Sequence, residues 1–148
     1  MNFYQWTVAG TAKLPTLDYD ILESWLKGVA QSHDKLVGDL NYIFCDDEEI
    51  LRVNRHFLNH DYYTDIITFD RSSRGIVRGD MYISLDTVKS NAEEREGSYE
   101  DELKRVIVHG LLHLCGINDK GPGERAIMEQ HENEALRALS EKVGNNEI

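Results

Sequence analysis

Apolar residues follow two different spacings along the chain, and each spacing predicts a different kind of element. Spacings of three and four residues place side chains on one face of a helix. They predict helices over residues 21–30, 46–58, 86–95, 99–115 and about 123–139. Compact or alternating runs rich in β-branched and aromatic residues predict strands over residues 3–8, 39–45, 64–69 and 79–85.

The order of these elements predicts the fold class. Strands and helices alternate without a regular βαβ repeat, so we expect an α+β layer in which helices pack on a mixed sheet of about four strands. Leu40, Tyr42 and Phe44 fall on one face of the second predicted strand and should point into the core. Asp46 is expected to cap the helix that follows.

Length and composition predict a single domain over residues 1–148. The chain has 148 residues, of which 41% are hydrophobic and 29% are charged, as suits one domain with its own core. Its start has no basic segment followed by an apolar run, and no stretch approaches the roughly 18 apolar residues of a membrane span. We therefore expect a cytoplasmic protein with no membrane partner, in which Cys45 and Cys115 are buried thiols.

The net charge of −11 argues against a nucleic-acid partner, because phosphate binding usually needs a basic surface. The distribution of charge weakens this objection. One basic group in a short loop consists of Arg71, Arg74 and Arg78. A second consists of Arg52, Arg55, His56 and His60. A locally positive cleft on an acidic protein is one interpretation, and solvated surface arginines are the other.

The segment HGLLHLCGIND, residues 109–119, has the spacing of a metal site. Histidines at i and i+4 lie on one face of a helix with Cβ atoms roughly 5–6 Å apart, so His109 and His113 can reach one ion. Gly116 can end the helix in the left-handed conformation and let the chain carry Asp119 back toward the histidines. Three ligands leave a fourth position open, which is typical of catalytic zinc.

Two alternatives limit what the spacing alone establishes. The histidines can also be satisfied by hydrogen bonds, with Gly116 as an ordinary helix end. A zinc peptidase, in turn, usually carries a glutamate general base after the first histidine, where this chain has Gly110. The missing glutamate disfavours peptide hydrolysis and makes phosphodiester cleavage the more natural reaction.

Three ordered motifs resemble those of the YbeY-type endoribonucleases. TDIITF (64–69), GDMYIS (79–84) and HGLLHLCG (109–116) are similar to the family's TDVLSF, GDIxIS and HGxLHLxG, within a resemblance that spans residues 50–116. It implies a zincin-like fold and Zn²⁺-dependent hydrolysis of single-stranded RNA, including maturation of the 3′ end of 16S rRNA and ribosome quality control. The implied partners are rRNA and the ribosome or its small subunit, with no DNA.

The chain departs from the family pattern at two positions. Asp119 stands where the family commonly has a third histidine, which lowers the charge of the ligand set by one and also suits iron. Leu58 stands where the family often has an arginine, a candidate phosphate contact. We expect Arg55 or His60 to replace that arginine.

The resulting hypothesis assigns roles to residues of three kinds. The predicted Zn²⁺ ligands are His109, His113 and Asp119. Substrate would lie across residues 65–69, with bases stacking on Tyr62, Tyr63 or Phe69, although a core position is the more natural role for Phe69. Asp65 would act in catalysis or orient a ligand histidine. The predicted phosphate contacts are Arg71, Arg74 and Arg78.

Other classes of protein remain open from the sequence. The alternatives are a zincin-like metallopeptidase, an iron oxygenase using the two histidines and one carboxylate, and a non-catalytic, ribosome-associated module whose metal only stabilises the turn at Gly116.

Overall fold

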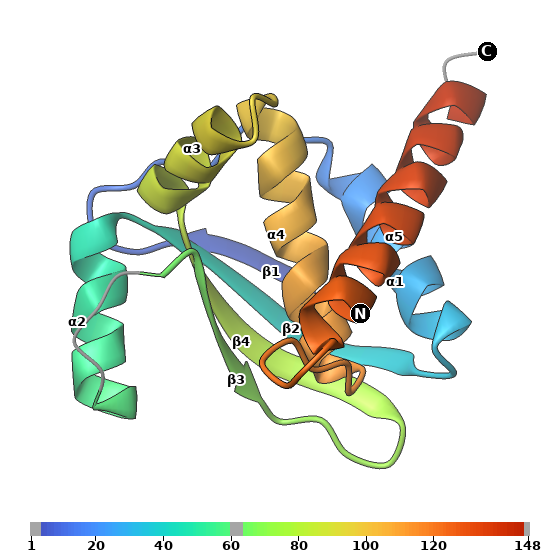
Figure 1. Cartoon of the computed structure of the whole chain (residues 1–148), viewed down its shortest axis with the longest axis horizontal. Helices are drawn as coiled ribbons and strands as arrows, with labels where there is room; N and C mark the ends of the chain where they lie inside the picture. Colours follow the sequence, from blue (N-terminus) through green and yellow to red (C-terminus); the bar gives the residue numbers. More distant parts are fainter. Residues whose placement is uncertain (1–3, 60–63, 147–148) are drawn as a thin grey trace.

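A four-stranded mixed sheet forms the centre of the computed structural model, which describes residues 4–59 and 64–146 (Figure 1). The elements in chain order are β1 (Tyr4–Val8), α1 (Tyr19–Ser32), β2 (Leu36–Cys45), α2 (Asp47–Leu58), β3 (Ile66–Asp70), β4 (Ile76–Ser84), α3 (Leu85–Glu94), α4 (Tyr99–Leu114) and α5 (Glu124–Asn146).

The strands are arranged in the order β1-β2-β4-β3. The pairs β1–β2 and β2–β4 are parallel, whereas β3 runs antiparallel to β4 at one edge. The α+β class and the mixed four-stranded sheet predicted from the sequence are therefore confirmed. As an edge strand, β3 has one side free of strand pairing within this sheet.

The main core lies between the sheet and the helices α1, α4 and α5. Leu40, Tyr42 and Phe44 of β2 are fully buried there, as their alternation predicts. Tyr42 donates a hydrogen bond of 2.9 Å from its hydroxyl to the carbonyl of Ile107 in α4. This bond satisfies the one polar group of a wholly buried ring and ties α4 to the middle of the sheet.

A smaller core joins α2 to the opposite face of the sheet. It consists of Cys45, Ile50, Val53 and Ile67, with Ala9, Phe69 and Tyr82 packed against it. Asp46 caps α2 as predicted, since its carboxylate accepts a 2.8 Å hydrogen bond from the backbone of Glu49. Thus α2 packs on the face of the sheet that carries the smaller core, while α1, α4 and α5 pack on the face that carries the main core.

Two strands begin earlier than their sequence patterns predict. The parallel ladder starts at Leu36 opposite Ile76, and the register shifts between Val37 and Leu40. The alternation is broken at Gly38, where an added Cβ would lie 2.9 Å from Ile76. Pairing with a distant strand, rather than local pattern, thus sets these two starts.

Among residues 4–59 and 64–146, no helix combines the length and apolar character that crossing a membrane requires.

Helix α4 passes very close to the sheet at Gly110. A Cβ atom at this position would lie 2.7 Å from Sδ of Met81 in β4 and 2.8 Å from Cδ1 of Ile66 in β3. Distances this short are repulsive, so a side chain at position 110 would force the side chains of Met81 and Ile66 to shift. The close approach sets the height of the two histidines on this helix above β3.

Gly110→Ala is expected to lower the free energy of unfolding by about 1–3 kcal/mol, because the added methyl group overpacks the core. Gly28→Ala is the matched control, since Gly28 lies within α1 and an added Cβ there meets no atom within 4 Å. The control should be stabilising by up to about 1 kcal/mol. Urea unfolding followed by circular dichroism measures both, and equal stability of the two variants would contradict the packing argument.

Candidate metal centre

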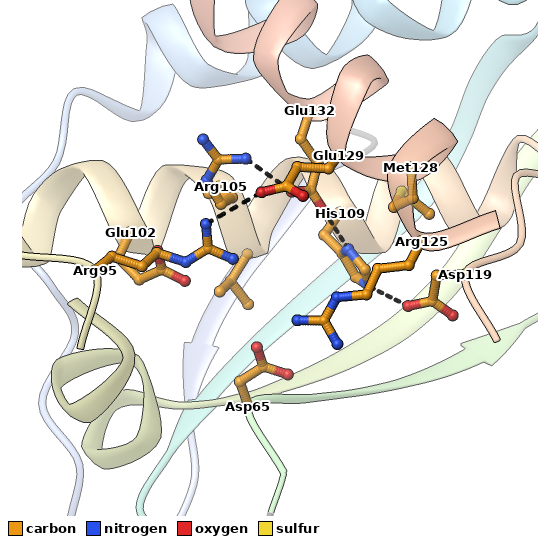
Figure 2. A pocket seen from close by; sticks show the side chains of 11 residues that line it. Asp65, Arg95, Glu102, Arg105, His109, Asp119, Arg125, Met128, Glu129 and Glu132 are labelled. Carbon is orange, nitrogen blue, oxygen red and sulfur yellow. Dashed lines mark hydrogen bonds and ion pairs between the residues drawn. The ribbon is translucent and has the colours of Figure 1, made fainter. Parts of the chain in front are cut away.

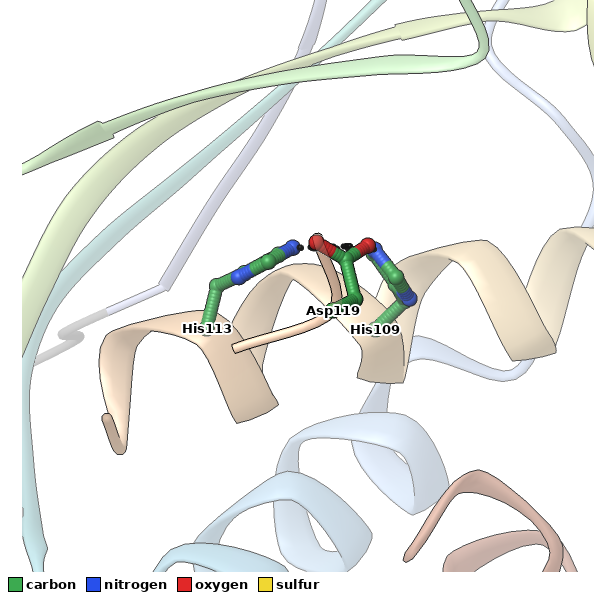
Figure 3. A group of neighbouring side chains, drawn as sticks. All are labelled: His109, His113 and Asp119. Atoms are coloured by element: carbon green, nitrogen blue, oxygen red, sulfur yellow. Dashed lines mark hydrogen bonds and ion pairs between the residues drawn. The ribbon is translucent and has the colours of Figure 1, made fainter. Parts of the chain in front are cut away.

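Figure 3 shows three side chains that converge at the C-terminal part of α4. The Nε2 atoms of His109 and His113 lie 3.0 Å apart. Oδ2 of Asp119, from the loop after the helix, lies 3.3 Å from Nε2 of His109 and 3.5 Å from Nε2 of His113. The structure thus brings together the three residues predicted as ligands, with one donor atom of each within 4.8 Å of the others.

Gly116 makes the turn that returns Asp119 to the helix. Its φ of 96° lies in the left-handed region, which a residue without Cβ adopts at little cost. The backbone N–H of Gly116 donates to the carbonyl of His113, and the N–H of Ile117 donates to the carbonyl of Leu112. The helix end is therefore satisfied as the chain reverses.

A buried carboxylate from α5 orients the first histidine. Oε2 of Glu132 lies 2.5 Å from Nδ1 of His109, and Oε1 of Glu132 accepts a 2.9 Å hydrogen bond from Arg105. We assign the proton to Nδ1 of His109 because a carboxylate faces it. The lone pair of Nε2 then points toward His113 and Asp119, as in metal-bound histidines whose other nitrogen donates to a carboxylate.

The charges around the centre favour a bound cation. Burial acts to lower the pKa of His109, but the hydrogen bond and charge of Glu132 outweigh it and raise this pKa. Burial and the neighbouring His109 lower the pKa of His113. Burial opposes ionisation of Glu132, yet its hydrogen bonds to His109 and Arg105 lower the pKa of this carboxyl group. Two imidazole nitrogens and one carboxylate oxygen fit Zn²⁺, and they also fit iron.

Sequence reasoning missed Glu132, although one signal was available. In α5 the buried positions Met128, Glu132, Ala135 and Leu139 share the face that packs on the core. A glutamate within such an apolar stripe needs a partner. The partner lies on another helix, 23 residues away in sequence, so the spacing of charges along α5 alone does not identify it.

Two hollows flank the three converging residues. The first, here called the α5-side hollow, lies against α4 and α5 and is lined by Asp65, Arg95, Glu102, Arg105, Val106, His109, Asp119, Arg125, Met128, Glu129 and Glu132 (Figure 2). The second, the β3-side hollow, is lined by Asn54, Leu58, residues 64–68, Asp70, His109, His113, Leu114 and residues 118–120. His109, Asp119 and Asp65 line both, so the candidate metal centre lies between them.

Asp65 lines both hollows together with His109 and Asp119. Its carboxylate accepts a 3.2 Å hydrogen bond from the side chain of Asn91, and burial raises the pKa of Asp65.

Leu58, at the position of the family arginine, lines the β3-side hollow. Arg55 lies on the exposed side of α2 and lines neither hollow. His60, Tyr62 and Tyr63 fall outside the described residues.

Of the three arginines predicted to contact phosphate, Arg71 and Arg74 lie in the turn between β3 and β4, and Arg78 lies in β4 itself. Arg71 pairs with Asp80 at 3.2 Å, and Arg78 donates to the Ser73 hydroxyl at 3.4 Å. Arg74 adopts a positive φ of 52° in the turn. None of the three lines either hollow within the described part of the chain.

Asp80 and Phe69 have structural roles, as the sequence favoured for Phe69. Asp80 accepts a 2.6 Å hydrogen bond from Asn41 of the neighbouring strand β2, in addition to its pair with Arg71. Phe69 packs edge-on against Phe57 and Tyr82, with ring centroids 5.7 Å and 6.1 Å away. It belongs to the smaller core rather than to the walls of the two hollows.

Comparisons with known proteins agree on one family. A sequence model described as "Endoribonuclease YbeY" matches residues 10–140. A protein of that description from Parabacteroides distasonis is 56% identical over 130 residues, covering 88% of this chain and 92% of its own length. Its counterpart from Porphyromonas gingivalis is 50% identical over 144 residues, covering 97% and 93%.

A solved structure supports the same fold. The solution structure of a Thermotoga maritima protein matches with a TM-score of 0.62, covering 97% of this chain and 93% of that chain. The two sequences are 23% identical, so this match concerns the fold alone.

Glu132→Gln is expected to weaken Zn²⁺ binding by about 10- to 100-fold, because the amide is a poorer acceptor for the Nδ1 proton of His109. Competition with a chromophoric chelator measures the affinity. Glu129→Gln, a change on the same helix at a half-exposed position paired with Arg95, is the control and should bind like the parent. If both variants bind Zn²⁺ equally well, Glu132 does not orient the ligand.

Proposed function

Because the chain belongs to the endoribonuclease YbeY family and is thus a phosphodiester-cleaving hydrolase, we propose that it cleaves single-stranded RNA with one Zn²⁺ ion per chain. The observation that carries the metal assignment is the convergence of His109, His113 and Asp119 with an oriented imidazole. These three residues would hold the ion.

When bound, Zn²⁺ would supply Lewis acidity toward a phosphoryl oxygen and toward water. The carboxylate of Asp119 makes the ligand set one charge more negative than three histidines would, which reduces that acidity. The same set accommodates iron, and metal reconstitution separates the two assignments. Glu132 contributes by holding the ring of His109 in place, so that little reorganisation accompanies metal binding.

Asp65 is the proposed proton acceptor of the reaction. It lines both hollows beside His109, and a carboxylate whose pKa is raised by burial accepts a proton more effectively near neutral pH than a solvated one. Its hydrogen bond from Asn91 keeps the side chain at this position. The predicted catalytic roles of Arg55 and His60 stay part of the proposal.

The β3-side hollow is the proposed path of the RNA strand. It follows the edge strand β3, whose five residues span roughly 17 Å and lead from the candidate metal centre to the hairpin that carries Arg71, Arg74 and Arg78. These arginines would contact phosphates several nucleotides from the cleaved bond. Such contacts position the strand without reading its sequence.

Packing at Gly110 argues against the peptidase alternative. In zinc peptidases of the HExxH type, the general base follows the first histidine. Here an added Cβ would come so close to Met81 and Ile66 that their side chains would have to shift. A glutamate at position 110 would therefore disturb the packing of α4 on the sheet, and a peptidase with this packing would need a different base.

The wider biological role forms the second part of the proposal. The chain would act as a single domain in the cytoplasm, in maturation of the 3′ end of 16S rRNA and in ribosome quality control. The net charge of −11 disfavours unassisted binding to RNA. A ribosomal component that presents the RNA would overcome this, so the ribosome or its small subunit is the proposed partner, and DNA is not a substrate.

Chelation should abolish cleavage of a single-stranded rRNA fragment, and added Zn²⁺ should restore it. His113→Ala should lose activity by at least about 100-fold together with its bound metal, because it removes one of three protein ligands. His33→Ala, at the C-terminal end of α1, is the matched histidine control and should cleave like the parent. Gel analysis of RNA products and metal analysis provide the readouts. Equal cleavage by chelated and Zn²⁺-loaded protein would reject the metal mechanism.

A further inference from the structure

We propose that Arg125 binds a phosphate of the RNA in the α5-side hollow, on the opposite side of the candidate metal centre from β3. The inference rests on the proposed cleavage of RNA. It assigns a binding role to a residue that is not part of the metal motif and is not one of the three arginines predicted to contact phosphate. It follows from which charged groups of this hollow are already paired.

The other two arginines of the hollow form ion pairs with glutamates of the protein. Arg95 pairs with Glu102 at 3.2 Å and with Glu129 at 3.6 Å. Arg105 pairs with Glu132 at 2.9 Å and donates to Asn133 at 2.8 Å. Their guanidinium groups stabilise the packing of α5 against α3 and α4. They are therefore poorly placed to bind a ligand without breaking these pairs.

Arg125 differs from both. Within residues 4–59 and 64–146 its side chain forms no hydrogen bond or ion pair, although it lines the hollow. Figure 2 shows its side chain extending from the start of α5 into the hollow, with the guanidinium on the side of Asp65 and near the candidate metal centre. The N–H donors of a guanidinium form a planar fork that matches the spacing of two phosphate oxygens. An unpaired guanidinium beside a proposed centre of phosphodiester cleavage is therefore suited to bind a phosphate of the substrate.

The carboxylates of the hollow have partners other than Arg125. Glu102, Glu129 and Glu132 already face arginines, and Asp119 faces the two histidines. Asp65 accepts a hydrogen bond from Asn91 and forms no ion pair with Arg125 within the described chain. The carboxylates of Glu102, Glu129 and Glu132 are thus directed at Arg95 and Arg105, which leaves Arg125 as the arginine of this wall that no carboxylate engages.

The position of Arg125 also fits cleavage within a chain rather than at its end. An endonuclease must accommodate nucleotides on both sides of the cleaved bond. The β3-side and α5-side hollows share His109 and Asp119, so a strand passing through both crosses the centre. Arg125 would then bind a phosphate of the RNA on the α5 side of the candidate metal centre. The residues of β3 would contact the RNA on the other side of the centre.

The test compares Arg125→Ala and Arg125→Lys with Arg137→Ala. Arg137 is an exposed arginine of the same helix that lines neither hollow, so its removal changes net charge equally. Two readouts are needed. One is the affinity of the chelated protein for a single-stranded oligoribonucleotide at several salt concentrations, and the other is kcat/KM of the Zn²⁺-loaded protein. Metal content is checked for each variant.

Arg125→Ala should reduce the slope of log affinity against log salt by about 0.7, the value for one single-strand phosphate contact. It should also reduce kcat/KM by about 10- to 100-fold, the range of a lost charge-assisted hydrogen bond. Arg125→Lys should keep the salt slope but recover only part of kcat/KM, because it retains the charge without the fork. Arg137→Ala should match the parent in kcat/KM.

Two outcomes would overturn the inference. If Arg125→Ala and Arg137→Ala behave alike in both readouts, Arg125 makes no specific phosphate contact. If Arg125→Ala loses its metal, the residue supports the metal centre instead. Failure of the proposed function looks different, because the Zn²⁺-loaded parent itself would then leave single-stranded RNA uncut.

Discussion

The hydrogen bond between Glu132 and His109 is the interaction on which the candidate site depends. It joins α5 to α4 at the point where the ligands converge, and Arg105 holds the other oxygen of the same carboxylate. Three side chains from two helices therefore fix one ring orientation. Without this bond the two histidines would still share a helix face, but the direction of the His109 lone pair would not be set.

Local signals in the sequence predicted what local forces determine. The capping role of Asp46, the alternation of Leu40, Tyr42 and Phe44, and the turn at Gly116 each depend on neighbours within a few residues, and each appears as predicted. The early starts of β2 and β4 depend on pairing between residues about 40 positions apart. No pattern within either segment contains that information, so the predicted starts were late.

The same distinction applies to the site. His109, His113 and Asp119 lie within 11 positions of one another, and a helix followed by a glycine turn is enough to bring them together. Glu132 and Arg125 reach the site only because α5 folds back beside α4. Each resembles an ordinary surface residue of a charged helix in the sequence. Their proposed roles depend on tertiary packing, which gives the Glu132 side chain two partners and leaves the Arg125 side chain with none among the described residues.

The dependence of His109 on α5 has a consequence for the growing polypeptide. During synthesis all three candidate ligands precede Glu132 in the chain, so a nascent chain that ends before α5 carries the ligands without the group that orients the imidazole. Such a chain also lacks Arg125, which is proposed to bind a phosphate of the RNA. The oriented candidate metal centre is therefore complete only after α5 has been synthesised and has packed beside α4.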